Sequence, residues 1–257
     1  MSGVRVRHEL RRRTVQVVAV DDISPRMRRI VVGGPELDGF VSLAADDHVK
    51  LFFPERRADR SAPPDPAILF AAPRRDYTPR RYDAASNTLT LEFVLHGDGP
   101  AAGWAAGALC GDWLGVAGPR GSLVPPDDDA PCLLVGDETA LPAIARRLEE
   151  MQPGVSCIAL IEVADETEIR HLPTPAHARI DWLTRNGAAA GTTTLLDRAL
   201  ESLTLPGDAR IWIAAEIDTA RRLRDHLVEA RGVDRAAVRA AGYWRLGMAE
   251  SEERLPA

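Results

Sequence analysis

The feature that most constrains the fold is a change of pattern at Pro125-Pro126-Asp127-Asp128-Asp129. Two prolines followed by like charges are typical of a linker. Before this point the apolar residues lie in short runs punctuated by glycine and proline. After it, apolar runs of strand length alternate with helical patterns. We therefore expect two domains, over residues 1–127 and 128–257.

The first domain is predicted to be an antiparallel β-barrel or sandwich, because short strands with Gly and Pro between them are typical of these folds. A charged, proline-rich stretch at Glu55–Pro66 predicts an exposed loop. The predicted strands are Thr14–Val20, Met27–Val32, His48–Phe53, Thr88–Leu95 and Asp112–Ala117.

The second domain is predicted to be α/β with a mostly parallel sheet, because strands that alternate with helices form βαβ units. The first helix, Thr139–Met151, has Leu141, Ile144, Ala145 and Leu148 on one face. The predicted strands are Cys132–Val135, Ser156–Val163, Arg179–Leu183, Arg210–Ala215 and Ala236–Ala241, and the later helices are Thr194–Leu203 and Thr219–Arg231.

Composition excludes several functional classes. The formal net charge of -6 argues against a nucleic-acid partner, which favours basic proteins. The N-terminus is rich in arginine without the apolar stretch of a signal peptide, and no window is long and apolar enough for a membrane span. The three cysteines, Cys110, Cys132 and Cys157, have no metal-site spacing. The last two lie in apolar runs, and we expect them to be buried small hydrophobes. We expect a cytoplasmic, monomeric protein without a metal site.

A first candidate site is Arg75-Asp76-Tyr77-Thr78, followed by Arg80. A flavin needs an aromatic wall for its ring, hydrogen-bond partners for its polar edge, and arginine or backbone amides for its pyrophosphate. Because side chains alternate on an extended segment, Arg75 and Tyr77 share one side and Thr78 faces the other. A surface arginine loop with a buried tyrosine fits the spacing equally well.

A second candidate is the glycine-rich run His96–Ala105, which follows a predicted strand and opens a short helix. Gly97 and Gly99 allow close approach of the backbone, and the first amides of a helix suit a phosphate. Trp104 can cover an apolar ring. The alternative is an ordinary glycine-rich turn with a core tryptophan.

A third candidate is the strand–loop–helix junction Val135–Pro142, where a nucleotide phosphate would dock in an α/β domain. It has no Gly-x-Gly-x-x-Gly pattern. Asp137 and Glu138 would repel a phosphate if they face the site, and favour the helix N-terminus if they do not. A capped helix start is the alternative.

In this order, the motifs resemble those of the siderophore-interacting protein family, flavin reductases related to the ferredoxin–NADP reductase superfamily. The matching stretches run over nearly the whole chain. They are His48–Pro54, Arg75-x-Tyr77-Thr78-x-Arg80, His96–Trp104, Gly118–Ser122, Gly136–Pro142, Trp212–Glu216 and Gly242-Tyr243-Trp244-Arg245-x-Gly247.

The resemblance implies an FAD-dependent reductase of ferric siderophores, with NADPH, NADH or ferredoxin as the electron donor. It places Tyr77 against the isoalloxazine, Thr78 near its polar edge, and the His96–Trp104 segment at the pyrophosphate and adenosine. The implied cofactor residues are Arg75, Tyr77, Thr78, Arg80, His96, Gly97, Gly99, Ala101, Ala102 and Trp104. The implied nucleotide residues are Gly136, Asp137, Glu138, Thr139, Ala215 and Glu216, although the family usually has Gly where Ala215 stands.

Many ferric siderophores are anionic, so an acidic protein needs a local basic patch to attract them. Lys50, Arg120 and Arg245 lie inside the matching motifs and are the expected substrate residues; three unrelated solvated side chains are the alternative. Two other functions remain open. One is a flavin reductase or diaphorase with another acceptor, and the other is a non-catalytic binder of iron chelates. No catalytic acid, base or nucleophile is expected, because the flavin supplies the chemistry.

Overall fold

The computed structural model describes residues 3–56, 59–97, 99–126 and 129–248. The chain divides into two compact units, Val4–Val124 and a second unit that begins at Pro125. The predicted domain boundary, between residues 127 and 128, lies outside the described residues. The expected fold class, an antiparallel β domain followed by a parallel α/β domain, is confirmed.

The first unit is built on a seven-stranded antiparallel sheet in the order β5-β4-β8-β2-β3-β7-β6. Its two edge strands, β5 and β6, are joined by only three residues, so the two edges of the sheet come together as in a barrel. The strands are β2 Arg12–Ser24, β3 Met27–Gly33, β4 Val49–Phe52, β5 Arg74–Tyr77, β6 Arg81–Asp83, β7 Thr88–Val94 and β8 Trp113–Ala117.

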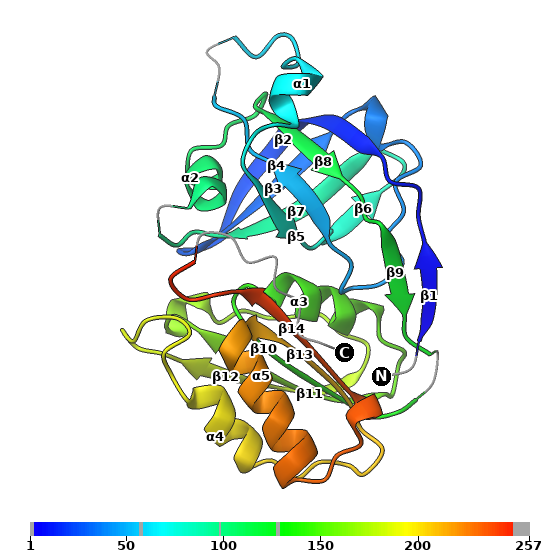
Figure 1. Cartoon of the computed structure of the whole chain (residues 1–257), viewed down its shortest axis with the longest axis vertical. Coiled ribbons are helices and arrows are strands. Elements are labelled where there is room, and N and C mark those ends of the chain that lie inside the picture. Colours follow the sequence, from blue (N-terminus) through cyan, green and yellow to red (C-terminus); the bar gives the residue numbers. More distant parts are fainter. Residues whose placement is uncertain (1–2, 57–58, 98, 127–128, 249–257) are drawn as a thin grey trace. The chain divides into compact units, whose positions relative to one another are not determined.

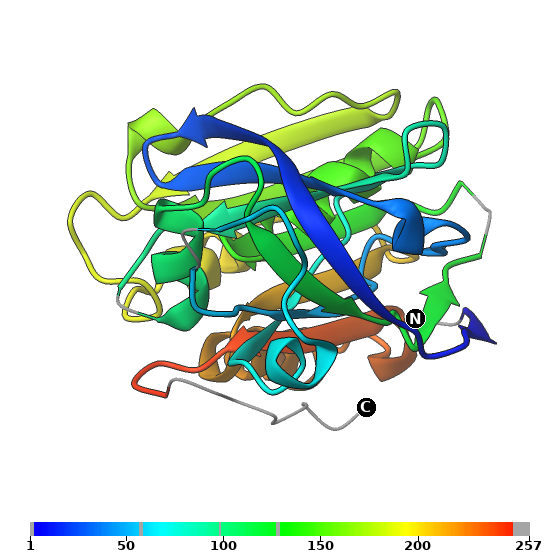
Figure 2. The same ribbon diagram turned by 90° about the horizontal axis from the view of Figure 1, so that it is seen from above.

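The strand predicted at Thr14–Val20 is longer in the structure, because β2 serves two partners. Its first residues pair with β8 and its later residues with β3, with a register shift between Val17 and Ala19. Figure 2 shows β2 as the long blue strand of this unit. Two short strands that the sequence analysis missed, β1 (Val4–Arg7) and β9 (Gly121–Val124), pair with each other.

Alternation along β7 builds the core of the barrel. Leu89, Leu91 and Phe93 are fully buried and pack with apolar residues of the other strands. Burial of each such side chain contributes roughly 1.5–3 kcal/mol. Two short helices flank the sheet, α1 (Pro66–Leu69) and α2 (Pro100–Ala106).

The second unit has a five-stranded, fully parallel sheet in the order β12-β11-β10-β13-β14. This order reverses direction between β10 and β13, which makes a topological switch point there. The strands are β10 Cys132–Asp137, β11 Ser156–Val163, β12 His177–Thr184, β13 Arg210–Glu216 and β14 Val238–Trp244.

Helices cover both faces of this sheet. Helix α3 (Leu141–Glu150) buries all four of its predicted apolar residues on one face, and α4 (Leu195–Glu201) and α5 (Ile217–Asp225) pack on the other. Helix α5 begins two residues before the predicted Thr219, because the Glu216 carboxylate caps it by accepting from the amides of Asp218 and Thr219.

Candidate functional site

The segment from Arg75 to Arg80 closes the barrel of the first unit. Arg75 and Tyr77 share one side of β5, as predicted from alternation, and both are half-buried. The strand ends at Tyr77, so Thr78 does not continue the alternation and is buried instead. The Arg80 amide then donates to the carbonyl of Thr90 on β7, 3.0 Å away. This bond lies next to the pairing of β6 with β7 and holds the end of the segment on β7.

Tyr77 belongs to a cluster of four aromatic rings. Its centroid lies 4.4 Å from that of Phe93 and 6.1 Å from that of Phe53. Trp104 completes the cluster, 5.6 Å from Phe53 and 6.1 Å from Phe93. The structure therefore joins two separately predicted cofactor segments through Phe53 and Phe93. The sequence analysis assigned no role to these two phenylalanines, although Phe53 lies in a matching motif and Phe93 follows the alternation of its strand.

The polar atoms beside this cluster are available to a ligand. Among the described residues, none forms a hydrogen bond with the hydroxyl of Tyr77 or of Thr78. Burial raises the pKa of the Tyr77 phenol above its ordinary value, so the phenol stays neutral at physiological pH. Two neutral hydroxyls can thus donate to or accept from the polar edge of a bound ring.

Arg80 has a structural task that the sequence analysis did not foresee. It is buried, and its Nε lies 3.5 Å from the Glu92 carboxylate on β7. Glu92 also accepts from Arg29, at 2.5 Å. Because Glu92 offsets the charge of Arg80, this arginine holds the segment on β7, and its contact with the cofactor stays a prediction.

The glycine-rich segment has open space around its backbone. A Cβ atom added at Gly97, Gly99 or Gly103 would meet no atom of the described residues within 4 Å. The φ of 58° at Gly97 favours glycine by itself, whereas described neighbours do not require glycine at Gly99 or Gly103, and a ligand can approach the backbone closely. Helix α2 follows, as expected, and no side chain caps its first amides at Ala101 and Ala102. His96 is exposed at the start of the segment, and Asp98 lies outside the described residues.

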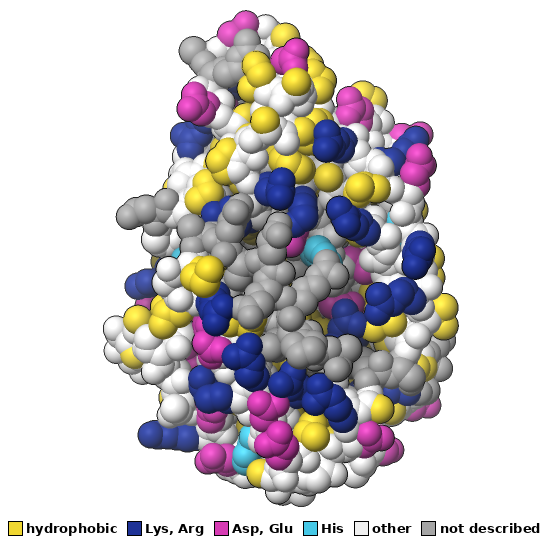
Figure 3. Space-filling model, in the orientation of Figure 1, with side chains coloured by type: hydrophobic (Ala, Val, Ile, Leu, Met, Phe, Trp, Pro, Cys, Tyr) yellow, Lys and Arg dark blue, Asp and Glu magenta, His cyan; other side chains and the backbone are white. Residues whose placement is uncertain are grey.

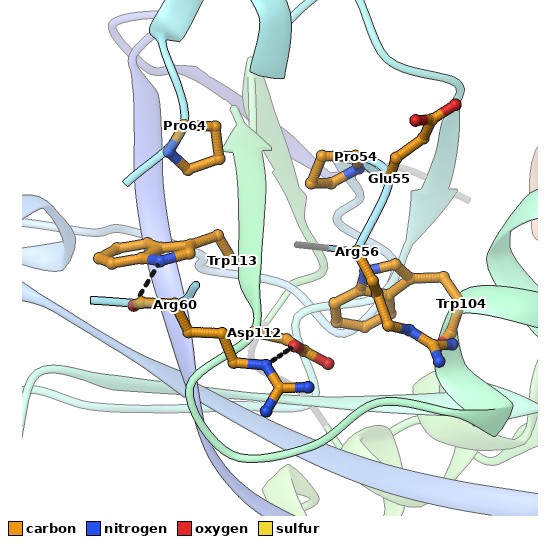
Figure 4. A pocket seen from close by; sticks show the side chains of 8 residues that line it. All are labelled: Pro54, Glu55, Arg56, Arg60, Pro64, Trp104, Asp112 and Trp113. Atoms are coloured by element: carbon orange, nitrogen blue, oxygen red, sulfur yellow. Dashed lines mark hydrogen bonds and ion pairs between the residues drawn. The ribbon is translucent and has the colours of Figure 1, made fainter. Parts of the chain in front are cut away.

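Trp104 also borders a small pocket on the same unit, shown in Figure 4. The predicted loop Glu55–Pro66 is exposed over most of its described residues, but its Arg60 reaches inward to Asp112, at 2.5 Å, and Pro64 is buried. Arg56 donates to the carbonyls of Gly103 and Trp104 and so fixes the end of α2. The pocket is lined by Pro54, Glu55, Arg56, Arg60, Pro64, Trp104, Asp112 and Trp113.

The predicted substrate residues are divided between the units. Lys50 lies on β4, and its Nζ is 3.1 Å from the Asp76 carboxylate of the neighbouring strand. Arg120 is exposed in the turn between β8 and β9 (Gly121–Val124). Arg245 follows β14 in the second unit. Lys50 pairs in register with Ala117, the last residue of β8, so Lys50 and Arg120 belong to the same unit.

The predicted nucleotide residues meet at the switch point of the parallel sheet. Asp137, at the end of β10, is buried and accepts from the amide and hydroxyl of Thr139. Its other oxygen accepts from the Glu216 amide at 3.0 Å and from the Trp244 indole at 2.8 Å. Four donors thus converge on one carboxylate. The sequence analysis missed Trp244 in this role, because the contact joins strands that are remote in sequence.

Glu138 faces Arg185 rather than open solvent. Both oxygens of Glu138 accept from the guanidinium, at 2.5 and 2.6 Å, and Glu162 lies 3.5 Å from the same group. Burial raises the pKa of the Glu162 carboxyl above its ordinary value, while a hydrogen bond from Thr193 opposes this. Arg185 therefore offsets part of the acidity at this edge of the sheet.

Gly136 and Ala215 have packing roles. A Cβ at Gly136 would lie 2.6 Å from the Cβ of Ala140 and from the carbonyl oxygen of Ala214, so only glycine lets α3 start this close to the sheet. Ala215 is fully enclosed on β13. These two residues shape the switch point, and their contact with a nucleotide stays a prediction.

Comparison with known protein families identifies both units. The family model described as siderophore-interacting FAD-binding domain matches residues 16–123. The model described as siderophore-interacting protein matches residues 130–247. Each unit is thus similar to one part of the same type of protein.

Individual relatives are similar over nearly the whole chain. The NADPH-dependent ferric-chelate reductase of Escherichia coli K12 is 41% identical over 252 residues, which cover 93% of this chain and 95% of that protein. The ferric vibriobactin reductase ViuB of Vibrio cholerae is 31% identical and covers 89% of this chain and 87% of its own. The crystal structure of a siderophore utilization protein from T. fusca has 42% identity and a TM-score of 0.86, with 98% and 99% coverage.

Proposed function

Because this chain belongs to the siderophore-interacting protein family, we propose that it reduces the ferric ion of a siderophore, with FAD as its cofactor and NADPH as its electron donor. The similarity to a ferric-chelate reductase and a ferric siderophore reductase supports the reaction. One structural observation supports the cofactor. A single barrel presents both the aromatic cluster, whose Tyr77 and Thr78 hydroxyls bond to none of the described residues, and the glycine segment before α2.

The described residues fit FAD in two parts. Tyr77 offers a ring face and Thr78 a hydroxyl for the isoalloxazine, and Arg75 supplies positive charge on the same side of β5. The backbone amides of Gly97, Gly99, Ala101 and Ala102 suit the pyrophosphate, and a Cβ added at either glycine would meet no described atom within 4 Å. Trp104 at the other end of this segment offers an apolar wall for the adenosine.

The chemistry that bound FAD supplies is the acceptance of two electrons and their release one at a time. In balance, one NADPH reduces two ferric ions to ferrous ions and leaves NADP+ and one proton. Ferrous iron is a poorer match for the hard oxygen ligands of a siderophore, so reduction favours release of the metal. The protein is required to bind and orient, which agrees with the lack of an assigned acid or base.

We assign the substrate to three basic side chains, Lys50 and Arg120 of the first unit and Arg245 of the second. The chain is acidic overall, yet Figure 3 shows Lys and Arg side chains on the surface of each unit, interspersed with acidic ones. Local positive charge attracts an anionic chelate even when the net charge is negative. We assign the donor to the switch point at Asp137–Thr139 and Ala215–Glu216, because ligands of open α/β sheets bind there.

Three finer statements belong to the proposal: the protein acts as a monomer, it works in the cytoplasm, and ferredoxin is the alternative donor. No helix in the described part of the chain is long and apolar enough to cross a membrane. The donor question has a direct test. Anaerobic stopped-flow measurements follow reduction of the bound flavin by NADPH, NADH and reduced ferredoxin in turn, and then its reoxidation by several ferric siderophores.

We expect the purified protein to be yellow and to release FAD, not FMN, when it is denatured and chromatographed. Absence of flavin after reconstitution would overturn the proposal and favour a non-catalytic binder. A flavin that is reduced by NADPH but reoxidised no faster by ferric siderophores than by other acceptors would favour a general diaphorase.

A further inference from the structure

Three sulfur atoms meet at the amino-terminal end of the parallel sheet. Cys132 on β10 and Cys157 on β11 are direct register partners, and both lie on the face of the sheet that α3 covers. Met151 ends α3, and its Sδ lies 4.0 Å from the Cys132 Sγ. Two thiols and one thioether thus converge from three elements of one unit. The sequence analysis predicted both cysteines as buried hydrophobes, and Cys132 is instead half-buried.

The Cys132 and Cys157 thiols contact each other through a hydrogen bond, and the positive charge of Arg147 on α3 acts on both. The Arg147 guanidinium lies over the Trp212 ring at 5.8 Å. Cys132 and Met151 are half-exposed, so the cluster has access to solvent.

Three sulfurs around a metal ion suit this arrangement, because sulfur ligands at about 2.3 Å in a trigonal plane lie about 4.0 Å from one another. The Cys132–Met151 distance agrees with this spacing.

We propose that Cys132, Cys157 and Met151 form a binding site for a soft monovalent cation, Cu(I) or Ag(I). Thiolate and thioether ligands select such cations, and the thioether is a poor ligand for harder ions. Among the described residues, no group of three or more His, Cys, Asp or Glu side chains could hold a metal. The proposed site has two cysteines and a methionine, so it is not such a group. Each cysteine that coordinates as thiolate releases its proton on binding, so the affinity increases with pH.

The test uses the flavin-loaded full chain with Cys110→Ser, which removes the exposed thiol of the other unit. The protein is titrated anaerobically with Cu(I) against a chromophoric Cu(I) chelator, and in a second series with Ag(I). We expect one equivalent to bind with either ion, and we expect tighter binding at higher pH. Native mass spectrometry gives the stoichiometry independently of reductase activity.

The ligand assignment is tested by matched variants. Met151→Leu keeps the volume of the side chain and the fold, and it should weaken binding at least tenfold; Met248→Leu, at an exposed methionine, should not. Cys132→Ser should abolish stoichiometric binding. The proposal is overturned if Cys132→Ser still binds one equivalent or if Met151→Leu binds as tightly as Met248→Leu.

Discussion

The Tyr77 and Phe93 rings pack with their centroids 4.4 Å apart and their planes tilted by 40°. Phe93 is fully buried in the barrel core, so it supports the inner side of Tyr77 and leaves the phenol hydroxyl without a partner in the described part of the chain. A ring held in this way is preorganised for a planar ligand, because little side-chain freedom remains to be lost on binding.

Tyr77→Ala should therefore weaken FAD binding far more than Tyr82→Ala. The stack contributes about 1 kcal/mol beyond burial, and more is lost with the supporting contacts. Tyr82 is a matched control, since it packs on the same core but hydrogen-bonds Leu37 and Asn87 instead. Flavin per folded protein, measured by absorbance after gel filtration, decides between them. Equal retention in the two variants would remove Tyr77 from the cofactor site.

Gly99→Ala should leave the melting temperature unchanged and weaken FAD binding severalfold. The added Cβ would meet no described atom within 4 Å, and the φ of -64° suits any residue. The methyl group would therefore clash only with a ligand bound close to the backbone. The contrast is Gly136→Ala, whose Cβ would lie 2.6 Å from the Ala214 carbonyl and should destabilise the second unit by about 1–3 kcal/mol. Thermal melts and FAD titrations separate the two effects. Unchanged FAD affinity in Gly99→Ala would contradict the assignment of the glycine segment.

The substrate assignment predicts opposite effects for removal of the basic side chains and for removal of the carboxylate that pairs with Lys50. Lys50→Ala combined with Arg245→Ala should raise KM for an anionic ferric siderophore and leave flavin content intact. Asp76→Asn should lower KM by at most about fivefold, because it removes the carboxylate that offsets Lys50 and an exposed pair is worth about 0.2–1 kcal/mol. Raised ionic strength should weaken binding by the wild type.

The control for Asp76→Asn is Asp181→Asn, which frees Arg179 in the other unit and changes the net charge equally. Its KM should stay that of the wild type. An unchanged KM in the double variant, with no salt effect, would contradict the assignment of these basic side chains to the substrate. The cofactor assignment would not be affected.

Glu162→Gln should change how stability depends on pH. Burial raises the folded-state pKa of Glu162 above its ordinary value, so the folded state binds this proton more tightly than the unfolded state. The contribution of Glu162 to stability therefore increases as the pH falls from above the folded pKa to below the ordinary value. Glutamine does not titrate. The free energy of unfolding of the variant, relative to that of the wild type, should therefore be higher at pH 8 than at pH 5. Urea denaturation at both values measures this, and a difference of the opposite sign would contradict it.

The sequence by itself determined the elements and their order. Local signals set these: alternation along Thr88–Leu95, the apolar face of Thr139–Met151, and glycine and proline between them. The sequence analysis did not predict the short strands β1, β6 and β9, because three or four residues show too little periodicity. The pairing of β1 with β9 is also remote in sequence. Motif order also predicted Arg75–Arg80 and His96–Trp104 as cofactor segments, which stays a prediction.

Only the tertiary structure decided what each of those side chains contacts. Phe53 and Phe93 pack between Tyr77 and Trp104. Arg80 forms an ion pair with Glu92. Both oxygens of Asp137 accept hydrogen bonds, from Thr139, Glu216 and Trp244. The same holds for the sulfur cluster, whose cysteines are 25 residues apart in sequence but adjacent in the sheet. The reason is physical: a local pattern sets which face a residue occupies, whereas the pairing of distant strands sets its neighbours, and chemistry depends on the neighbours.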